Sequence, residues 1–190
     1  MPSLSERTGT ALIFITHDLS LMVEFSDRIG VMSARPGRVV REVAIDDLLR
    51  RDPVKLDHDQ VAKFVEGRTV LITGAGGSIG SELSRQVLRF EPAKVLLFDH
   101  DENALFHIER ELRDEHPGKV VPLIGDITDG ARVDQVMAAH RPNVVLHAAA
   151  HKHVPMMEAN PCEAVKNNVF GTITVAEAAH RHEVDAFVLI

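Results

Sequence analysis

The sequence predicts an α/β fold in which a doubly wound parallel sheet is covered by helices on both faces. Three observations predict it. From about residue 67 onward, short apolar runs alternate with segments of helical periodicity. The runs are apolar at successive positions, as in parallel strands that are buried on both faces. The first run also leads through a glycine-rich turn, TGAGGSIG at 73–80, directly into a helix.

Five strands alternate with four helices in this part of the chain. The strands are expected at 68–73, 93–99, 119–126, 143–150 and 186–190. The helices between them are expected at 78–90, 102–118, 129–142 and 161–184. The first helix repeats apolar residues at helical spacing (Ile79, Leu83, Val87 and Phe90), the second stops at Pro117-Gly118, and the fourth begins at Pro161. The fifth strand runs to the last residue, so the sheet is expected to be incomplete at its C-terminal end.

The glycine-rich turn is a candidate phosphate cradle. Gly74 permits a tight turn, Gly77 lets the backbone approach a pyrophosphate, and Gly80 lets helix and strand pack closely. The N–H groups at the start of the helix would then receive the anion. No Lys-Ser or Lys-Thr follows the glycines, which excludes the loop of a nucleotide triphosphatase. The turn predicts a dinucleotide-binding Rossmann fold with these candidate cofactor residues: Gly74, Gly76, Gly77, Ser78, Ile79 and Gly80.

Asp99 ends the second strand, 25 positions after Gly74, where such folds hold the adenosine ribose on an acid. Asp101 and Glu102 follow it, and no arginine does, so a 2′-phosphate would be repelled and NAD is favoured over NADP. NADP stays possible, because a protonated His100 would help a phosphate. The alternative reading of Asp99 is a helix cap or a solvated carboxylate.

Two other strand ends add candidates. Asp126 and Ile127, after the third strand, would bracket the adenine ring, and the alanines 148–150 (Ala148, Ala149 and Ala150) would leave room for a cofactor after the fourth. The nearby histidines His147, His151 and His153 are not expected to bind a metal. Their spacing suits a metal only on a helix, and no Cys or carboxylate stands at a matching distance along the chain.

Residues 1–67 do not follow the strand–helix alternation and are expected to form a small appendage. It divides into a segment at 1–43 and a linker with a packing helix at 44–67, before the dinucleotide-binding domain at 68–190. Residues 28–43 predict two short strands around an Arg-Pro-Gly turn. Residues 11–40 resemble the tail of an ABC-transporter ATPase, with His17 as its switch histidine. The other motifs of ATP hydrolysis are missing from the sequence, so this activity is not expected.

Several segments together resemble the extended short-chain dehydrogenases of polysaccharide biosynthesis, and more narrowly the 4,6-dehydratases of UDP-N-acetylglucosamine. The resemblance covers about residues 42–190 and rests on TGAGGSIGSEL, LLFDHDENAL, GDITD, HAAAHKHVPMMEANPCEAVKNNVFGT and FVLI. It implies that the candidate residues above hold NAD and that Lys152 and His153 face a UDP-sugar substrate. It also implies that Asn168 steadies the neighbouring backbone.

The chemistry that the resemblance implies is an internal redox reaction. Hydride leaves sugar C4 for the nicotinamide, water is lost across C5–C6, and the hydride returns. In that family a Ser-Thr-Asp-Lys-like segment just after the fifth strand, and a later tyrosine in many members, perform this step. The sequence stops at Ile190 and has no tyrosine. No catalytic residue is therefore assigned, and the chain is expected to be inactive alone.

Composition excludes several other classes of protein. The content of 45% hydrophobic and 26% charged residues is globular, and the net charge of -7 argues against nucleic-acid binding. No apolar run reaches the ~18 residues of a membrane span, and the N-terminus is too polar for a signal peptide. The single cysteine, Cys162, excludes an intrachain disulfide and favours the cytoplasm. Cys162 is expected to be a small buried apolar group.

Two alternatives to a dehydratase stay open. One is a nucleotide-sugar epimerase of the same superfamily, since the cofactor half of the fold barely distinguishes the two reactions. The other is a non-catalytic nucleotide-binding or interaction module. A last strand with one uncovered flank also predicts self-association.

Overall fold

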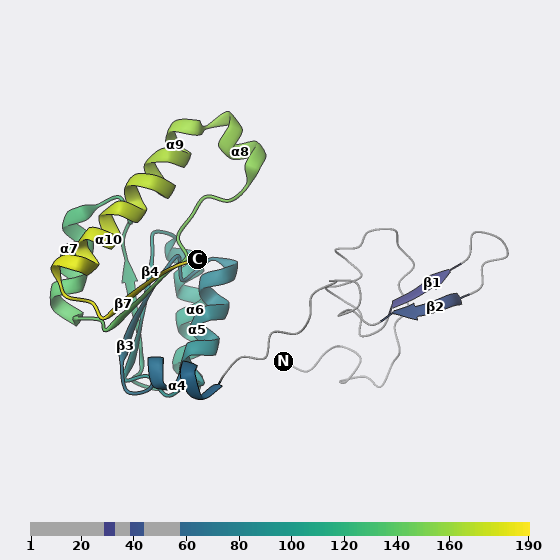
Figure 1. Cartoon of the computed structure of the whole chain (residues 1–190), viewed down its shortest axis with the longest axis horizontal. Coiled ribbons are helices and arrows are strands. Elements are labelled where there is room, and N and C mark those ends of the chain that lie inside the picture. The colour runs from purple at the N-terminus through teal and green to yellow at the C-terminus, as the bar shows by residue number, and fades with distance from the viewer. Residues whose placement is uncertain (1–28, 33–38, 44–57) are drawn as a thin grey trace. The chain divides into compact units, whose positions relative to one another are not determined.

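The computed structural model describes residues 29–32, 39–43 and 58–190 (Figure 1). The chain divides into two units, Met1–Lys55 and Leu56–Ile190. In the first unit, β1 (Ile29–Met32) and β2 (Val39–Val43) pair antiparallel, so both expected strands are present. The ATPase-like histidine His17 lies outside the described residues.

The second unit holds one parallel sheet and the helices that connect its strands. In chain order its elements are α4 (His58–Val65), β3 (Thr69–Thr73), α5 (Ser78–Leu88), β4 (Lys94–Asp99), α6 (Glu102–Glu115), β5 (Val120–Ile124), α7 (Gly130–His140), β6 (Val144–His147), α8 (Val154–Ala159), α9 (Pro161–Val165), η1 (Lys166–Gly171), α10 (Thr172–Arg181) and β7 (Ala186–Leu189). The strands are ordered β5-β4-β3-β6-β7, and every neighbouring pair is parallel. The chain therefore winds outward from β3 in both directions, which confirms the doubly wound fold.

The sheet separates two apolar cores. Val70 and Ile72 of β3 belong to the core under α5 and α6, whereas Leu71 between them belongs to the core under α7 and α10. Figure 1 shows these two helix pairs on opposite faces of the sheet. This alternation is the reason why the strands read as apolar at successive positions.

The expected helix at 161–184 is wrong as a single regular element. The chain first forms the short α8, and then α9 runs into the π-helical turn η1 before α10 begins. The periodicity of apolar residues cannot reveal such a turn, because one extra residue per turn hardly changes the pattern over six residues.

One burial expectation is wrong. Cys162 is exposed, because it lies on α9, a helix in which no residue is buried. Ile79, a candidate cofactor residue, is 51% exposed in the first turn of α5. None of the helices in the described ranges has the length and apolar character that crossing a bilayer requires.

Candidate functional site

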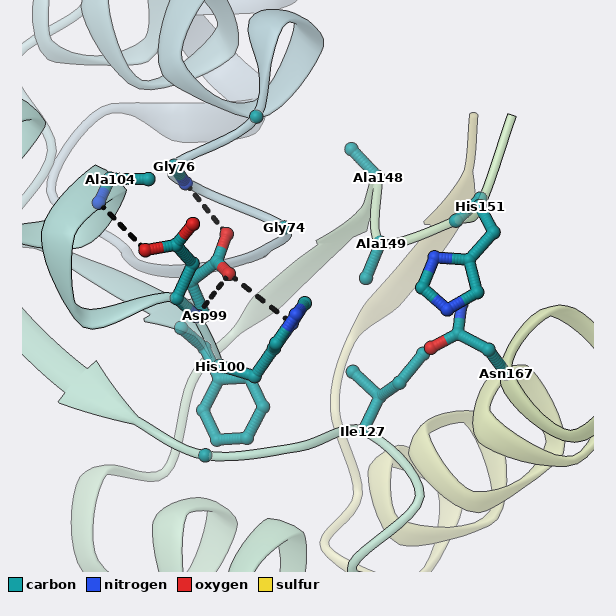
Figure 2. Close-up of a pocket in the computed structure, with 15 residues that line it drawn as sticks. Gly74, Gly76, Asp99, His100, Ala104, Ile127, Ala148, Ala149, His151 and Asn167 are labelled. Carbon is teal, nitrogen blue, oxygen red and sulfur yellow. Dashed lines mark hydrogen bonds and ion pairs between the residues drawn. The ribbon is translucent and has the colours of Figure 1, made fainter. Parts of the chain in front are cut away.

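A cavity of about 240 Å³ opens at the carboxyl ends of the central strands (Figure 2). Parallel strands end at the same edge of a sheet, so the turns that follow β3, β4, β5 and β6 meet there. β3 and β6 are the neighbours between which the winding direction reverses. The cavity is lined by Gly74, Gly76, Gly77, Phe98, Asp99, His100, Asp101, Ala104, Gly125, Ile127, Ala148, Ala149, Ala150, His151 and Asn167.

Two glycines, in the turn after β3 and at the start of α5, stand where a side chain has no room. Gly74 has φ +68°, and a Cβ on it would lie 2.8 Å from the backbone of Ala148 and Ala149. A Cβ on Gly80 would lie 2.0 Å from the carbonyl oxygen of Gly74. Gly80 thus lets α5 approach the turn itself rather than the strand. Both positions require glycine, and together they bring the start of α5 to the cavity.

Asp99 joins this turn to the next one. Its side chain is 7% exposed, and its Oδ2 accepts a hydrogen bond of 2.8 Å from the backbone N–H of Gly76. Its Oδ1 accepts a bond of 3.0 Å from the N–H of Asp101 and lies 3.5 Å from Nδ1 of His100. Oδ2 thus retains a lone pair for a further donor. The carboxylate is fixed in place and can accept hydrogen bonds from a ligand in the cavity.

The start of α5 offers unpaired donors to an anion. Gly77 precedes the helix and provides no side-chain cap, and the first turn contains no acidic residue. Among the described residues, no acceptor contacts the backbone N–H groups of Ser78 and Ile79, as is usual for the first turn of a helix. These groups and the helix dipole make the start of α5 electropositive.

The opposite wall follows β6. It carries only small side chains at Ala148, Ala149 and Ala150, which leave space in the cavity. Figure 2 shows His151 and Asn167 across the cavity from His100. Asn168 holds the backbone of His151 from both sides. Its Oδ1 accepts from the His151 N–H at 2.8 Å, and its Nδ2 donates to the His151 carbonyl at 2.9 Å.

His147 lies beneath this wall at the end of β6. The side chain is 1% exposed, and its ring stacks on Phe187 with the centroids 5.8 Å apart. Burial lowers the pKa of His147 to about 4, because the charged ring would lose its hydration. The ring is therefore neutral near pH 7. Among the described residues, no group of three or more His, Cys, Asp or Glu side chains is placed to hold a metal ion.

The cavity brings together most of the residues that the sequence suggested. Those that line it are Gly74, Gly76, Gly77, Asp99, Ile127, Ala148, Ala149 and Ala150. Gly80 is buried beneath the turn, and Ser78 and Ile79 are exposed at its edge. Asp126 is exposed, and its carboxylate accepts from the backbone and the hydroxyl of Thr128. Lys152 and His153 are exposed on the segment after the alanines.

Sequence reasoning missed several lining residues. Gly125 could have been found from the sequence, because it is a glycine that directly follows the strand β5. A Cβ there would lie 2.6 Å from the ring of Phe98. Ala104 also had a signal in the sequence, because a small residue in the first turn of α6 faces the glycine turn. Asn167 and His151 had none, because the π-helical turn and tertiary contacts place them.

Comparisons with known proteins agree with this geometry. The family model described as "Polysaccharide biosynthesis protein" matches residues 70–190. The Staphylococcus aureus capsular polysaccharide biosynthesis protein CapD is 47% identical over 153 residues, which are 80% of this chain and 26% of CapD. A Campylobacter jejuni UDP-N-acetylglucosamine 4,6-dehydratase (inverting) is 33% identical over 119 residues, 62% of this chain and 34% of that enzyme.

A solved structure has a similar fold. The UDP-glucose 4-epimerase of Stenotrophomonas maltophila, with bound NAD and formylated UDP-arabinopyranose, superposes with a TM-score of 0.59 at 26% identity. The match covers 64% of this chain and 36% of the epimerase. The chain thus spans about a third or less of the relatives that it matches. With the family model matching most of its length, the chain belongs to the polysaccharide biosynthesis protein family.

Proposed function

We propose that this chain binds NAD in the cavity at the carboxyl ends of β3, β4 and β6. The observation that carries the proposal is the hydrogen bond between Asp99 and the N–H of Gly76. It ties a buried carboxylate, suited to ribose hydroxyls, to a glycine turn suited to a diphosphate. The NAD-bound epimerase of similar fold supports the same assignment.

The residues present fit this cofactor. A Cβ on Gly76 would lie 2.6 Å from the Cβ of Ala104, so the turn is closed to side chains but open to a ligand that approaches its backbone. The N–H groups that begin α5 would take the diphosphate, with Asp99 on the adenosine ribose. Asp126 and Ile127 would lie on the adenine side, and the alanines 148–150 would border the nicotinamide.

Charge favours NAD over NADP. The carboxylates of Asp99 and Asp101 both line the cavity, and Glu102 follows them. A 2′-phosphate placed near Asp99 would therefore meet negative charge.

The test is isothermal titration of the chain with NAD and NADP. We expect NAD to bind with a Kd between about 1 μM and 1 mM, a free energy of roughly −8 to −4 kcal/mol, and NADP to bind more weakly. Ile79→Asp adds one negative charge at an exposed position beside the diphosphate site, and Ile79→Asn is its neutral match in shape. Ile79→Asp should weaken NAD about tenfold relative to Ile79→Asn. Folded chain that does not bind NAD, or equal affinities for the two variants, would contradict the site.

For the whole reaction we propose 4,6-dehydration of a UDP-sugar, with this chain supplying the dinucleotide-binding part. The 33% identity with the Campylobacter dehydratase supports it. Lys152 and His153, exposed beyond the alanines, would face the sugar nucleotide. The second candidate is epimerisation, which the structural likeness to the epimerase favours. A protein that joins this chain to the remaining length of its relatives can distinguish the two reactions. Mass spectrometry of its products should show loss of water only for dehydration.

Two further properties belong to this proposal. We propose that β7 pairs with a second copy of the chain, because β7 is an edge strand of the sheet and its Val188 and Leu189 are exposed. Light scattering should then show a dimer or larger species, and a strictly monomeric chain would contradict the pairing. The exposed free thiol of Cys162 suits a reducing compartment, which keeps the cytoplasm as the proposed location.

A further inference from the structure

His147 is a buried polar side chain to which the NAD site assigns no contact. Its Nδ1 lies 2.7 Å from the hydroxyl of Thr73, and its Nε2 lies 3.0 Å from the hydroxyl of Thr172. The ring is buried and does not line the cavity. A polar ring in an apolar core destabilises the fold unless it is paired, so these two bonds account for its tolerance there.

The hydrogen bonds around His147 have one consistent direction. Thr172 donates its only hydroxyl hydrogen to the carbonyl of Asn168, at 2.8 Å. It can therefore only accept from His147, so Nε2 must carry the proton of the neutral ring. Nδ1 then accepts from the hydroxyl of Thr73. The result is a directed relay from Thr73 through His147 and Thr172 to Asn168.

The two ends of this relay lie at the two walls of the cavity. Thr73 is the last residue of β3 and directly precedes Gly74 of the glycine turn. At the other end, Asn168 holds the backbone of His151 by two hydrogen bonds, and His151 lines the cavity. The segment from Ala148 to His153 is neither helix nor strand, so it depends on such contacts for its shape.

We propose that His147 is a positioning residue that fixes the wall at 148–153 relative to the glycine turn, through Thr172 and Asn168. The inference rests on the proposed NAD site for its functional meaning. Its structural content stands separately: the relay should order the backbone at His151 whether or not a ligand is present. The mechanism needs the single tautomer with the proton on Nε2.

Two neighbouring threonines offer a matched test. Thr172→Val removes the hydroxyl that accepts from His147. Thr174→Val removes a hydroxyl that makes the same kind of bond, 2.9 Å to the carbonyl four residues earlier, but does not contact His147. Thr172→Ser keeps the hydroxyl and serves as the conservative rescue.

The first readout is amide hydrogen exchange at His151 in the full chain, followed by NMR. Losing one buried hydrogen bond from the relay should speed this exchange about tenfold in Thr172→Val. Thr174→Val and Thr172→Ser should leave it near the wild-type rate. Equal exchange at His151 in both valine variants would overturn the proposal.

The second readout uses the unmodified chain, so it decides even if Thr172→Val does not fold. The ¹⁵N resonances of His147 at pH 7 should show a protonated Nε2 and a bare Nδ1. The opposite tautomer, or a rapid mixture of both, would overturn the relay.

The third readout separates the relay from the site. The Kd for NAD should rise about fivefold in Thr172→Val and stay unchanged in Thr174→Val. If the wild-type chain binds no NAD, the proposed function fails while exchange and tautomer still decide the relay. If NAD binds equally to both valine variants, the relay does not shape the site, and the proposal is wrong.

Discussion

Lowering the pH from 7 to 5 should reduce the free energy of unfolding by about 2 kcal/mol through His147 alone. The pKa of this ring is about 4 in the folded chain, against 6.5 without burial. Between these two values the unfolded chain binds a proton that the folded chain does not bind. Stability from this group is therefore complete above about pH 6.5 and decreases as the pH falls toward 4. From pH 6.5 to 5, at about 1.36 kcal/mol per pH unit, the loss is about 2 kcal/mol.

The assay is urea-induced unfolding of the wild type, His147→Phe and His147→Gln at pH 7, 6 and 5. Neither replacement titrates, so the other histidines of the eleven in the chain cancel in the difference. Paired carboxyl groups do not interfere, because their pKa values are lowered from ordinary values that already lie below pH 5, as for Glu82, Glu91, Glu111, Asp126 and Asp134. The stability advantage of the wild type over each variant should shrink by about 2 kcal/mol between pH 7 and 5.

A constant advantage over this range would refute the reasoning. It would mean that the ring of His147 titrates alike in the folded and unfolded chains, as a hydrated histidine does. The relay to Thr172 would then lose its physical basis, because a hydrated ring needs no fixed partners. Agreement between the phenylalanine and glutamine variants matters, since their shapes differ and only the lost titration is common to both.

Three further substitutions, the first with a control, test a close backbone contact, a helix cap and an exposed ion pair of the second unit. Gly80→Ala should lower the free energy of unfolding by about 3 kcal/mol in thermal unfolding, because the new Cβ would lie 2.0 Å from the carbonyl oxygen of Gly74. Gly130→Ala is the control: its Cβ would lie 3.6 Å from the nearest atom, so it should leave the stability unchanged. Asp101→Ala should cost about 1 kcal/mol in urea unfolding, because its side chain accepts from two backbone N–H groups at the start of α6. Arg85→Ala should change stability by less than about 1 kcal/mol in the same assay despite its two bonds to a carboxylate, because the ion pair is exposed.

The sequence predicted one half of the cavity lining because local patterns determine it. Gly74, Gly76 and Asp99 lie on consecutive elements, and each is required by the backbone next to it: a positive φ, a space closed to a Cβ, and the end of a buried strand. Runs that are apolar at successive positions also predicted strands buried on both faces. None of this needs knowledge of contacts between distant segments.

The other half depends on such contacts and was predicted only in part: the sequence suggested the alanines 148–150 and the resemblance implied Asn168, but neither suggested His151 or Asn167. Asn167 reaches the cavity through a π-helical turn, and His151 is held by Asn168, seventeen positions later in the chain. Cys162 was predicted to be buried because free cysteines usually are, but no residue of α9 is buried. Residue preferences describe an average environment, and the segment from α8 to η1 departs from it.

This asymmetry has a consequence for binding. On the side proposed for adenosine, Asp99 is already held by the N–H groups of Gly76 and Asp101, so a ribose would find its acceptor preorganised and little ordering would oppose binding. On the other side, the backbone at His151 is held by the side chain of Asn168 in η1, whose carbonyl accepts from Thr172 in α10. Fragments test the difference: AMP should bind equally to the wild type and Thr172→Val, whereas NAD should distinguish them. Loss of AMP affinity in Thr172→Val would show that the two halves are not independent.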